Sequence, residues 1–74
     1  MTLREWCDAH PQTNMKYLRL TGPTGDEWTL AHAWRVGKDE PPVIGMFLFP
    51  GDATEGETKF VQTPYESWMN WTVR

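Results

Sequence analysis

Large side chains alternate with mostly small ones along residues 28–36, WTLAHAWRV. A two-residue period is typical of a β-strand, because successive side chains point to opposite faces of a sheet. The pattern therefore predicts a strand with one large face and one small face. The large face would contain Trp28, Leu30, His32, Trp34 and Val36.

Residues 43–49, VIGMFLF, are apolar at both odd and even positions. This pattern favours a central strand that is covered on both faces. Weaker strand patterns occur at 15–20 and 59–62, and segments containing glycine and proline separate the predicted strands. Because the connections are short, we expect neighbouring strands to be antiparallel and to form a meander.

The first residues predict a capped helix that ends near residue 9. Thr2 is followed by Glu5 at the spacing of a capping box. Pro11 disfavours helical geometry at the residue before it, so the helix stops there. One helical face would contain Leu3, Trp6, Cys7 and His10.

The tail repeats this capping pattern, which predicts a second, short helix. Thr63 suits the N-cap, Pro64 the first helical position and Glu66 the N3 position. Residues 65–73 also alternate, so an edge strand remains an alternative for the tail. We favour the helix because the capping box and the proline agree.

Together these elements predict a single α+β domain over residues 1–74, in the order α-β-β-β-β-α. Its core would be an antiparallel meander of three or four strands with the N-terminal helix and the short C-terminal helix packed against one face. A chain of 74 residues buries only about 60% of the surface that its unfolded form exposes. Large side chains therefore matter for its stability.

The chain contains five tryptophans, which is more indole surface than so small a core is expected to enclose. We expect Trp6, Trp28 and Trp34 to form the centre of the core. In the tail, Trp68 would pack inward and Trp71 would stay partly exposed. A partly exposed aromatic tail is a candidate anchor for a partner protein. The tail site comprises Tyr65, Trp68 and Trp71. The alternative is that Trp71 closes the edge of the core.

Carboxylates gather in two loops that an antiparallel meander brings to the same end of the sheet. The net charge is −3, so the chain lacks the basic footprint of a general nucleic-acid binder. Five clustered acids, with Lys59 as the nearest counter-charge, would attract a partner protein with a basic surface. The alternative is ordinary solvated loop charge. The acidic site comprises Asp26, Glu27, Asp52, Glu55 and Glu57.

Candidate catalytic and metal-binding side chains are few. Cys7, His10 and His32 provide only three nitrogen or sulfur ligands, whereas a structural zinc site usually has four, and Asp8 is the only carboxylate beside them. Cys7 shares the apolar helix face, where a neutral thiol is expected. No phosphate-binding glycine motif is present. We therefore predict no catalytic residue, no metal and no cofactor.

Cysteine content and hydropathy also bear on location. A single cysteine excludes an internal disulfide and suits a reducing cytoplasm. We see no secretion signal, and no apolar stretch approaches the roughly 18 residues that span a bilayer. The sequence therefore predicts a cytoplasmic protein without a membrane partner; the compartment would be the host cytoplasm if a phage encodes the chain.

Three functional hypotheses follow, and the sequence favours the first. The first is a non-enzymatic small acidic protein-binding module that does not bind nucleic acid directly. A specific form, by analogy of size and charge, is a phage or mobile-element inhibitor of the anti-CRISPR or anti-restriction type that blocks a nucleic-acid-handling protein. The second is a structural or assembly subunit acting as a homodimer or larger homo-oligomer. The third is a small metal-binding or Cys/His enzyme.

Overall fold

The computed structural model describes the whole chain, residues 1–74, as one five-stranded sheet with two short helices. The elements are α1 (Leu3–Ala9), β1 (Arg19–Thr21), β2 (Glu27–Val36), β3 (Val43–Pro50), β4 (Lys59–Pro64), α2 (Tyr65–Met69) and β5 (Thr72–Val73). The predicted α+β class is confirmed, with one strand more than expected. The strand predicted over 15–20 begins later than the pattern indicated, at Arg19.

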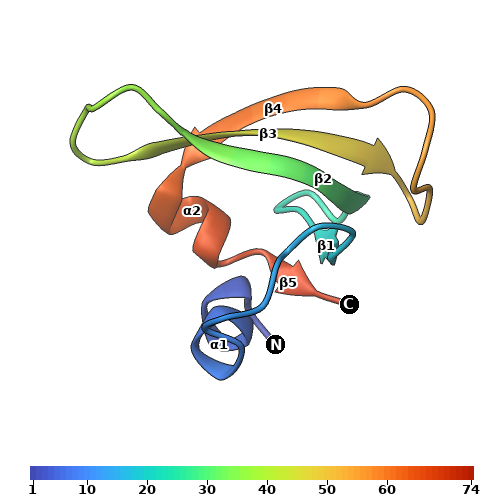
Figure 1. Ribbon diagram of the computed structural model, residues 1–74, viewed down its shortest axis with the longest axis horizontal. Coiled ribbons are helices and arrows are strands. Elements are labelled where there is room, and N and C mark those ends of the chain that lie inside the picture. The colour runs from blue at the N-terminus through green and yellow to red at the C-terminus, as the bar shows by residue number, and fades with distance from the viewer.

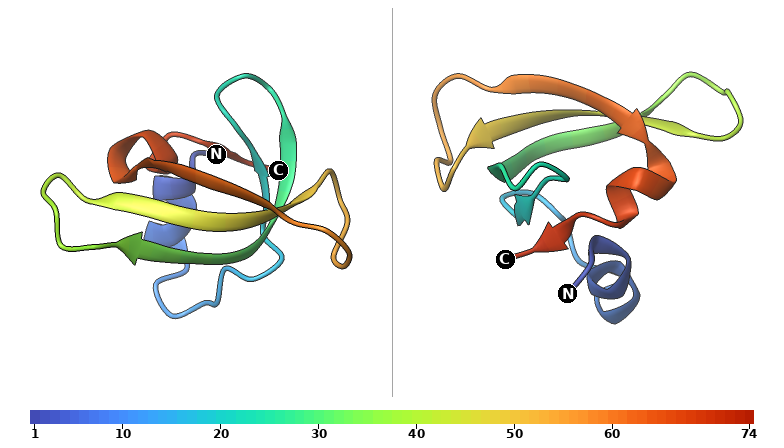
Figure 2. Two further views of the ribbon diagram at one scale, coloured as in Figure 1. Left: turned by 90° about the horizontal axis from the view of Figure 1, so that it is seen from above. Right: turned by 180° about the vertical axis from the view of Figure 1, so that it is seen from behind.

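The strands are all antiparallel and lie in the order β4-β3-β2-β1-β5. The first four strands form the expected meander, and β5 extends the sheet by pairing with β1. Both helices lie below the long strands β2, β3 and β4 in Figure 1. Seen from above, these strands lie in front of α1 and no element crosses over them (Figure 2, left). The helices therefore cover one face of the long strands and leave the other bare.

The predicted capping box at the start of α1 is confirmed. The Glu5 amide donates to Thr2 Oγ1 at 3.2 Å, and the Thr2 amide donates to Glu5 Oε1 at 2.8 Å. Two backbone bonds then fix this end against the tail: Leu3 N–H donates to the Trp71 carbonyl and Val73 N–H to the Met1 carbonyl, both at 2.8 Å. The two ends of the chain consequently stabilise each other.

The tail contains both of the structures that its sequence allowed. Residues 65–69 form the short helix α2, and Thr72–Val73 form the edge strand β5. The predicted role of Thr63 is wrong, because Thr63 belongs to β4 and pairs with Ile44. Pro64 occupies the N-cap position, and no side chain caps the helix there.

The core lies between the helices and the inner face of the sheet. Trp68 and Trp71 are 3% and 5% exposed and are its largest members. Trp6 and Trp28 are half-buried at its margin. The cluster comprises Leu3, Leu20, Leu30, Ile44, Met46, Leu48, Trp68, Met69 and Trp71. The expectation that Trp71 is partly exposed is therefore wrong. The expectation that Trp6, Trp28 and Trp34 form the centre of the core is also wrong, because Trp6 and Trp28 lie at its margin and Trp34 lies outside it.

Candidate protein-binding surface

A β-bulge at Ala31 moves the side chains of the second half of β2, residues 32–36, to the opposite face of the sheet. Leu30 pairs with Leu48 and His32 with Phe47, so Ala31 is an extra residue opposite the β3 ladder. One inserted residue moves every following side chain to the other face of the sheet. Trp28 and Leu30 therefore contact the core, whereas His32 and Trp34 lie on the outer face. The prediction that Trp28 and Trp34 share a face is wrong for this reason.

Four aromatic rings meet on the outer face and form the aromatic patch: His32 and Trp34 of β2, Phe47 of β3 and Phe60 of β4. The Trp34 centroid lies 5.4 Å from His32, 5.2 Å from Phe47 and 5.8 Å from Phe60. Phe47 and Phe60, which are cross-strand partners, have centroids 5.9 Å apart. Trp34 is thus the central ring of a continuous aromatic surface across three strands.

Gly45 allows the Trp34 ring to lie close against the sheet. Gly45 is the cross-strand partner of Trp34. A Cβ at this position would lie 3.0 Å from Cε2 and Cζ2 of Trp34 and 3.0 Å from Cγ2 of Val36. Such distances are shorter than ordinary carbon contacts of about 3.5–4.0 Å. The missing side chain therefore provides the space that the indole occupies.

The aromatic patch is open to solvent. Phe47 and Phe60 are 40% and 50% exposed, and His32 is exposed as well. The prediction that β3 is covered on both faces is therefore wrong: its inner residues are buried, but no helix or strand covers its outer face. Apart from Met1, all the exposed large apolar side chains lie on this side of the molecule or beside it.

A second aromatic pair lies beside the patch. Phe49 is two residues from Phe47 on the same face of β3, and the Tyr17 ring lies 6.4 Å from it. Tyr17 has a backbone φ of 67°, which is unusual for a bulky residue, and its N–H donates to the Leu30 carbonyl at 2.7 Å. Tyr17 is 47% exposed and covers Phe49, which is 9% exposed.

The outer strand positions around the patch have no charge. By alternation from the observed register, these positions are 32, 34 and 36 in β2 beyond the bulge, 43, 45, 47 and 49 in β3, and 60, 62 and 64 in β4. None is Asp, Glu, Lys or Arg. Single-stranded nucleic acids are usually bound where aromatic rings combine with a positively charged groove. This face has the rings without the groove, so its chemistry suits an apolar protein surface better.

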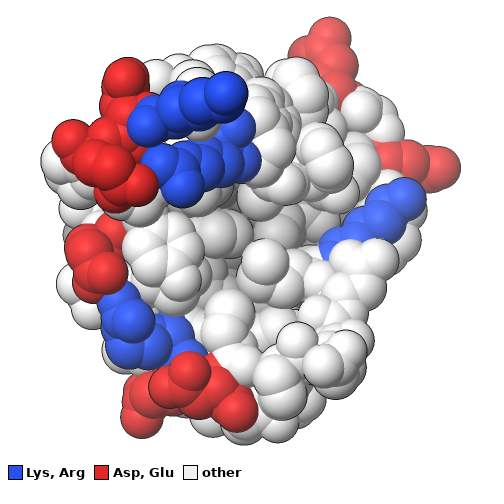
Figure 3. Space-filling model, turned by 60° about the vertical axis from the view of Figure 1, so that its left-hand side comes forward, with Lys and Arg blue, Asp and Glu red and all other residues white.

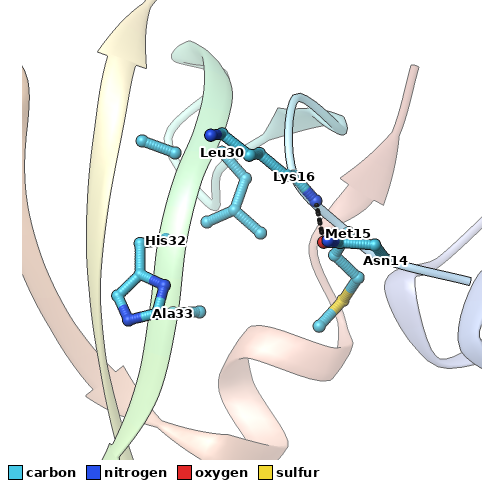
Figure 4. A pocket seen from close by; sticks show the side chains of 7 residues that line it. Asn14, Met15, Lys16, Leu30, His32 and Ala33 are labelled. Atoms are coloured by element: carbon cyan, nitrogen blue, oxygen red, sulfur yellow. Dashed lines mark hydrogen bonds between the residues drawn. The ribbon is translucent and has the colours of Figure 1, made fainter.

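A pocket of about 330 Å³ adjoins the patch at His32 (Figure 4). It is formed by residues 14–16 and by residues 30–33 of β2, which follow the part of β2 that pairs with β1. The Asn14 side chain accepts a hydrogen bond from the Lys16 amide at 2.8 Å and shapes the loop. In Figure 4, Met15 and His32 lie on opposite sides of β2, with the His32 ring on the outer side. The pocket lining has no hydroxyl, thiol or carboxylate side chain.

The predicted aromatic tail is mostly inside the protein. Trp68 and Trp71 belong to the buried core, and only Tyr65 is half-buried. The Trp68 indole N–H has no hydrogen-bond partner, and it faces the interior rather than solvent. An unpaired buried donor costs about 1–3 kcal/mol. In this fold Trp68 and Trp71 stabilise the domain and offer no exposed ring to a partner.

The structure brings two of the five predicted acids together on one arginine. Glu27 and Asp52 both accept from Arg74, at 3.2 and 2.8 Å, and Arg19 lies 3.7 Å from Asp52. Arg74 also donates to the carbonyls of Trp28 and Gly51. The counter-charge is therefore arginine; Lys59 instead lies 5.7 Å over the Trp28 ring.

The other three predicted acids form no ion pair. Asp26 accepts from the Thr24 hydroxyl at 2.9 Å, and Glu55 and Glu57 are exposed in the loop before β4. Figure 3, in which the side with the β2–β3 loop comes forward, shows acidic and basic side chains in small mixed groups on that side, away from the loop before β4. Arginines thus neutralise two of the five predicted acids, Glu27 and Asp52.

The candidate metal-binding and catalytic residues lie in different environments. Cys7 is half-buried with its sulfur 4.0 Å from that of Met15, and burial raises the pKa of the Cys7 thiol, with a further contribution from Asp8. The His10 ring stacks on Trp6 at 4.6 Å, whereas His32 lies on the outer face. The structure contains no group of three or more His, Cys, Asp or Glu side chains that could hold a metal ion.

Comparison with protein-family models, with curated proteins and with solved structures found no significant match. The longest helix, α1, has seven residues, and neither helix has the length and apolar character needed to cross a membrane. The function must therefore be inferred from the surface itself.

The sequence contained a partial signal for the aromatic patch. Residues 43–49 are apolar on both faces, but the two helices predicted for so short a chain could cover only one. That mismatch points to Phe47 as an uncovered ring. No comparable signal existed for Trp34, because nothing in Ala-His-Ala predicts a bulge.

Proposed function

We propose that this chain is a non-enzymatic protein-binding module whose docking surface is the aromatic patch. The observation that supports this most strongly is the uncovered sheet face on which His32, Trp34, Phe47 and Phe60 touch ring to ring without a charged neighbour on the surrounding strand positions. Aromatic side chains at the centre of an interface supply much of its binding energy.

The partner that fits is a protein with an apolar groove or loop flanked by basic residues. Rings would enter the apolar part, and unpaired acids of the loop before β4, Glu55 and Glu57, would meet the basic flank. Charges at the rim of an interface chiefly raise the association rate. The patch therefore provides most of the affinity in this proposal, and the loop acids assist encounter.

A narrower form of the proposal is an inhibitor of the anti-CRISPR or anti-restriction type, encoded by a phage or mobile element and acting in the host cytoplasm. It would dock against a nucleic-acid-handling protein and place its loop acids where phosphates normally lie. The support for this form is small size and a net charge of −3.

The test is quantitative affinity capture from a lysate of the cell in which the protein acts. The baits are wild type, the patch variant Phe47→Ser/Phe60→Ser, and the control Asp8→Ser/Gln12→Ser, whose changed residues are exposed outside the outer face. Circular dichroism and urea unfolding confirm that each bait is folded. We expect a protein that wild type and control retain and the patch variant loses at least tenfold.

The salt dependence of capture then distinguishes binding through the aromatic patch from binding through the loop acids. Capture through the aromatic patch should survive about 0.5 M salt, whereas a contribution from the loop acids should weaken as the Debye length shortens. The proposal is wrong if every captured protein binds the patch variant as well as it binds wild type.

A further inference from the structure

β4 is the outermost long strand, and one side of its backbone is unpaired. β3 pairs with it from Leu48↔Lys59 to Val43↔Pro64, and no strand lies beyond it. Tyr65 N–H donates to the Pro42 carbonyl at 2.9 Å, which continues this ladder. Because bonding direction alternates along an antiparallel strand, residues 59, 61 and 63 face β3 and residues 60, 62 and 64 face outward.

This edge has little protection against strand addition. Proteins commonly block exposed edges with charges, prolines or a covering element. In β4 the only charge is Lys59 and the only proline is Pro64, one at each end of the strand. Between them, Phe60 and Gln62 each present an outward N–H and C=O, so four polar groups are available to a new strand.

We propose that a second copy of this chain pairs with this edge, β4 against β4, antiparallel, with the two-fold axis at Val61. Phe60 then lies opposite Gln62 of the second copy, and Gln62 opposite Phe60 of the second copy. This register forms four backbone hydrogen bonds and satisfies every outward group of Phe60 and Gln62 in both chains.

Neighbouring registers do not satisfy every outward group of Phe60 and Gln62 within the strand. An axis at Gln62 sets Phe60 opposite Pro64, which has no N–H, so the Phe60 carbonyl stays unpaired. An axis at Phe60 sets Gln62 opposite Thr58, which lies outside β4. The axis at Val61 also places Lys59 opposite Thr63 of the second copy, so no like charges face each other.

The pairing would join the two aromatic patches. Phe60 is on the outer face, and the Phe60 side chains of the two copies are diagonal neighbours across the axis, which is within reach of aromatic rings. The dimer would present one aromatic surface built from six long strands. This inference rests on backbone groups of the β4 edge and does not depend on the proposed function.

A cysteine pair tests the register directly. In a Cys7→Ala background, Val61→Cys places two thiols at a non-hydrogen-bonded pair, whose close Cβ atoms suit a disulfide. The matched control is Thr63→Cys, because position 63 is also half-buried and faces β3. In the proposed register the Cα atoms at position 63 of the two copies are four residues apart along the strands, or about 13 Å.

We expect mild oxidation to convert most of Val61→Cys to a covalent dimer while Thr63→Cys remains uncrosslinked. Equal crosslinking of both variants, or none of Val61→Cys, would overturn the register.

Sedimentation equilibrium provides a second measurement that needs no cysteine. Wild type should show a reversible monomer–dimer equilibrium. Gln62→Pro removes an outward N–H that β3 does not use, and should weaken dimerisation at least tenfold with an unchanged circular dichroism spectrum. A wild-type protein that stays monomeric at millimolar concentration contradicts the dimer. Loss of lysate capture by Phe47→Ser alone, with dimerisation intact, would identify the patch function as separate.

Discussion

At the scale of single residues, Gly45 explains how the large Trp34 ring lies close against an uncovered sheet face. A Cβ at Gly45 would come within 3.0 Å of two indole atoms and of the Val36 side chain. Glycine in a strand interior is unfavourable for entropy, and it often marks a place where another group approaches closely. Here that group is the central ring of the aromatic patch.

Gly45→Ala should destabilise the domain by about 1 kcal/mol, the low end for adding a methyl to packed surroundings, because the indole is able to shift. Urea unfolding measures this. In a Trp34→Ala background the same substitution should cost less or become stabilising, because most of the obstructing atoms are gone. An equal cost in both backgrounds would show that Trp34 does not lie on Gly45.

The same residues show where sequence reasoning stops. The alternation over 28–36 is a real period of two, and it identified the strand correctly. The bulge at Ala31 interrupts this alternation without leaving a signal in the sequence, because a bulge changes backbone pairing without requiring a particular side chain. The alternation could therefore not predict the faces of His32 and Trp34, which lie beyond the bulge.

At the scale of elements, one of the two predicted helix caps was correct and the other was wrong. The box at Thr2 and Glu5 predicted α1 correctly, because the backbone bridge of Thr2 to Thr72 leaves the Thr2 side chain free to cap the helix. The similar signal at Thr63 failed because Thr63 pairs with Ile44 in β4. Ladder hydrogen bonds and burial outweigh a local cap, which moved the start of α2 to Tyr65. The tail then had enough residues left to form β5.

The α1 cap predicts an acid-dependent loss of stability. The Thr2 backbone N–H, and then its side chain, lower the pKa of Glu5 below its ordinary range. A depressed pKa stabilises the folded state above the unfolded value, about 4.3, and this contribution is lost as pH falls through the folded pKa. Glu5→Gln should therefore flatten the pH dependence of the unfolding free energy below about pH 4.3. A parallel profile for wild type and variant would contradict this.

At the scale of the whole molecule, two short helices cover one face of the sheet. α1 has seven residues and α2 has five, and both lie under the long strands (Figure 1). The inner face takes Trp68 and Trp71, and the outer face keeps Trp34, Phe47 and Phe60. The sequence predicted correctly that one domain has more aromatic surface than its core encloses, but it assigned the wrong tryptophan to the outside.

The positive charges also differ in role between arginine and lysine. Each of the four arginines, Arg4, Arg19, Arg35 and Arg74, forms an ion pair within the domain, whereas none of the three lysines does. Arg74 is the most buried of them and links the β2 start to the β3 end. The acidic end is thus partly used to hold the fold together, which leaves the aromatic patch as the stronger candidate for binding.

The most direct test compares the two tryptophans whose places the sequence reversed. Trp71→Ala removes a buried core ring and should cost about 3–5 kcal/mol, or leave the chain unfolded without denaturant. Trp34→Ala removes a ring from an uncovered face and should cost about 1 kcal/mol, with the circular dichroism spectrum of the folded state preserved. Urea unfolding of both variants decides the matter. A cost for Trp34→Ala equal to or above that for Trp71→Ala would contradict an exposed aromatic face.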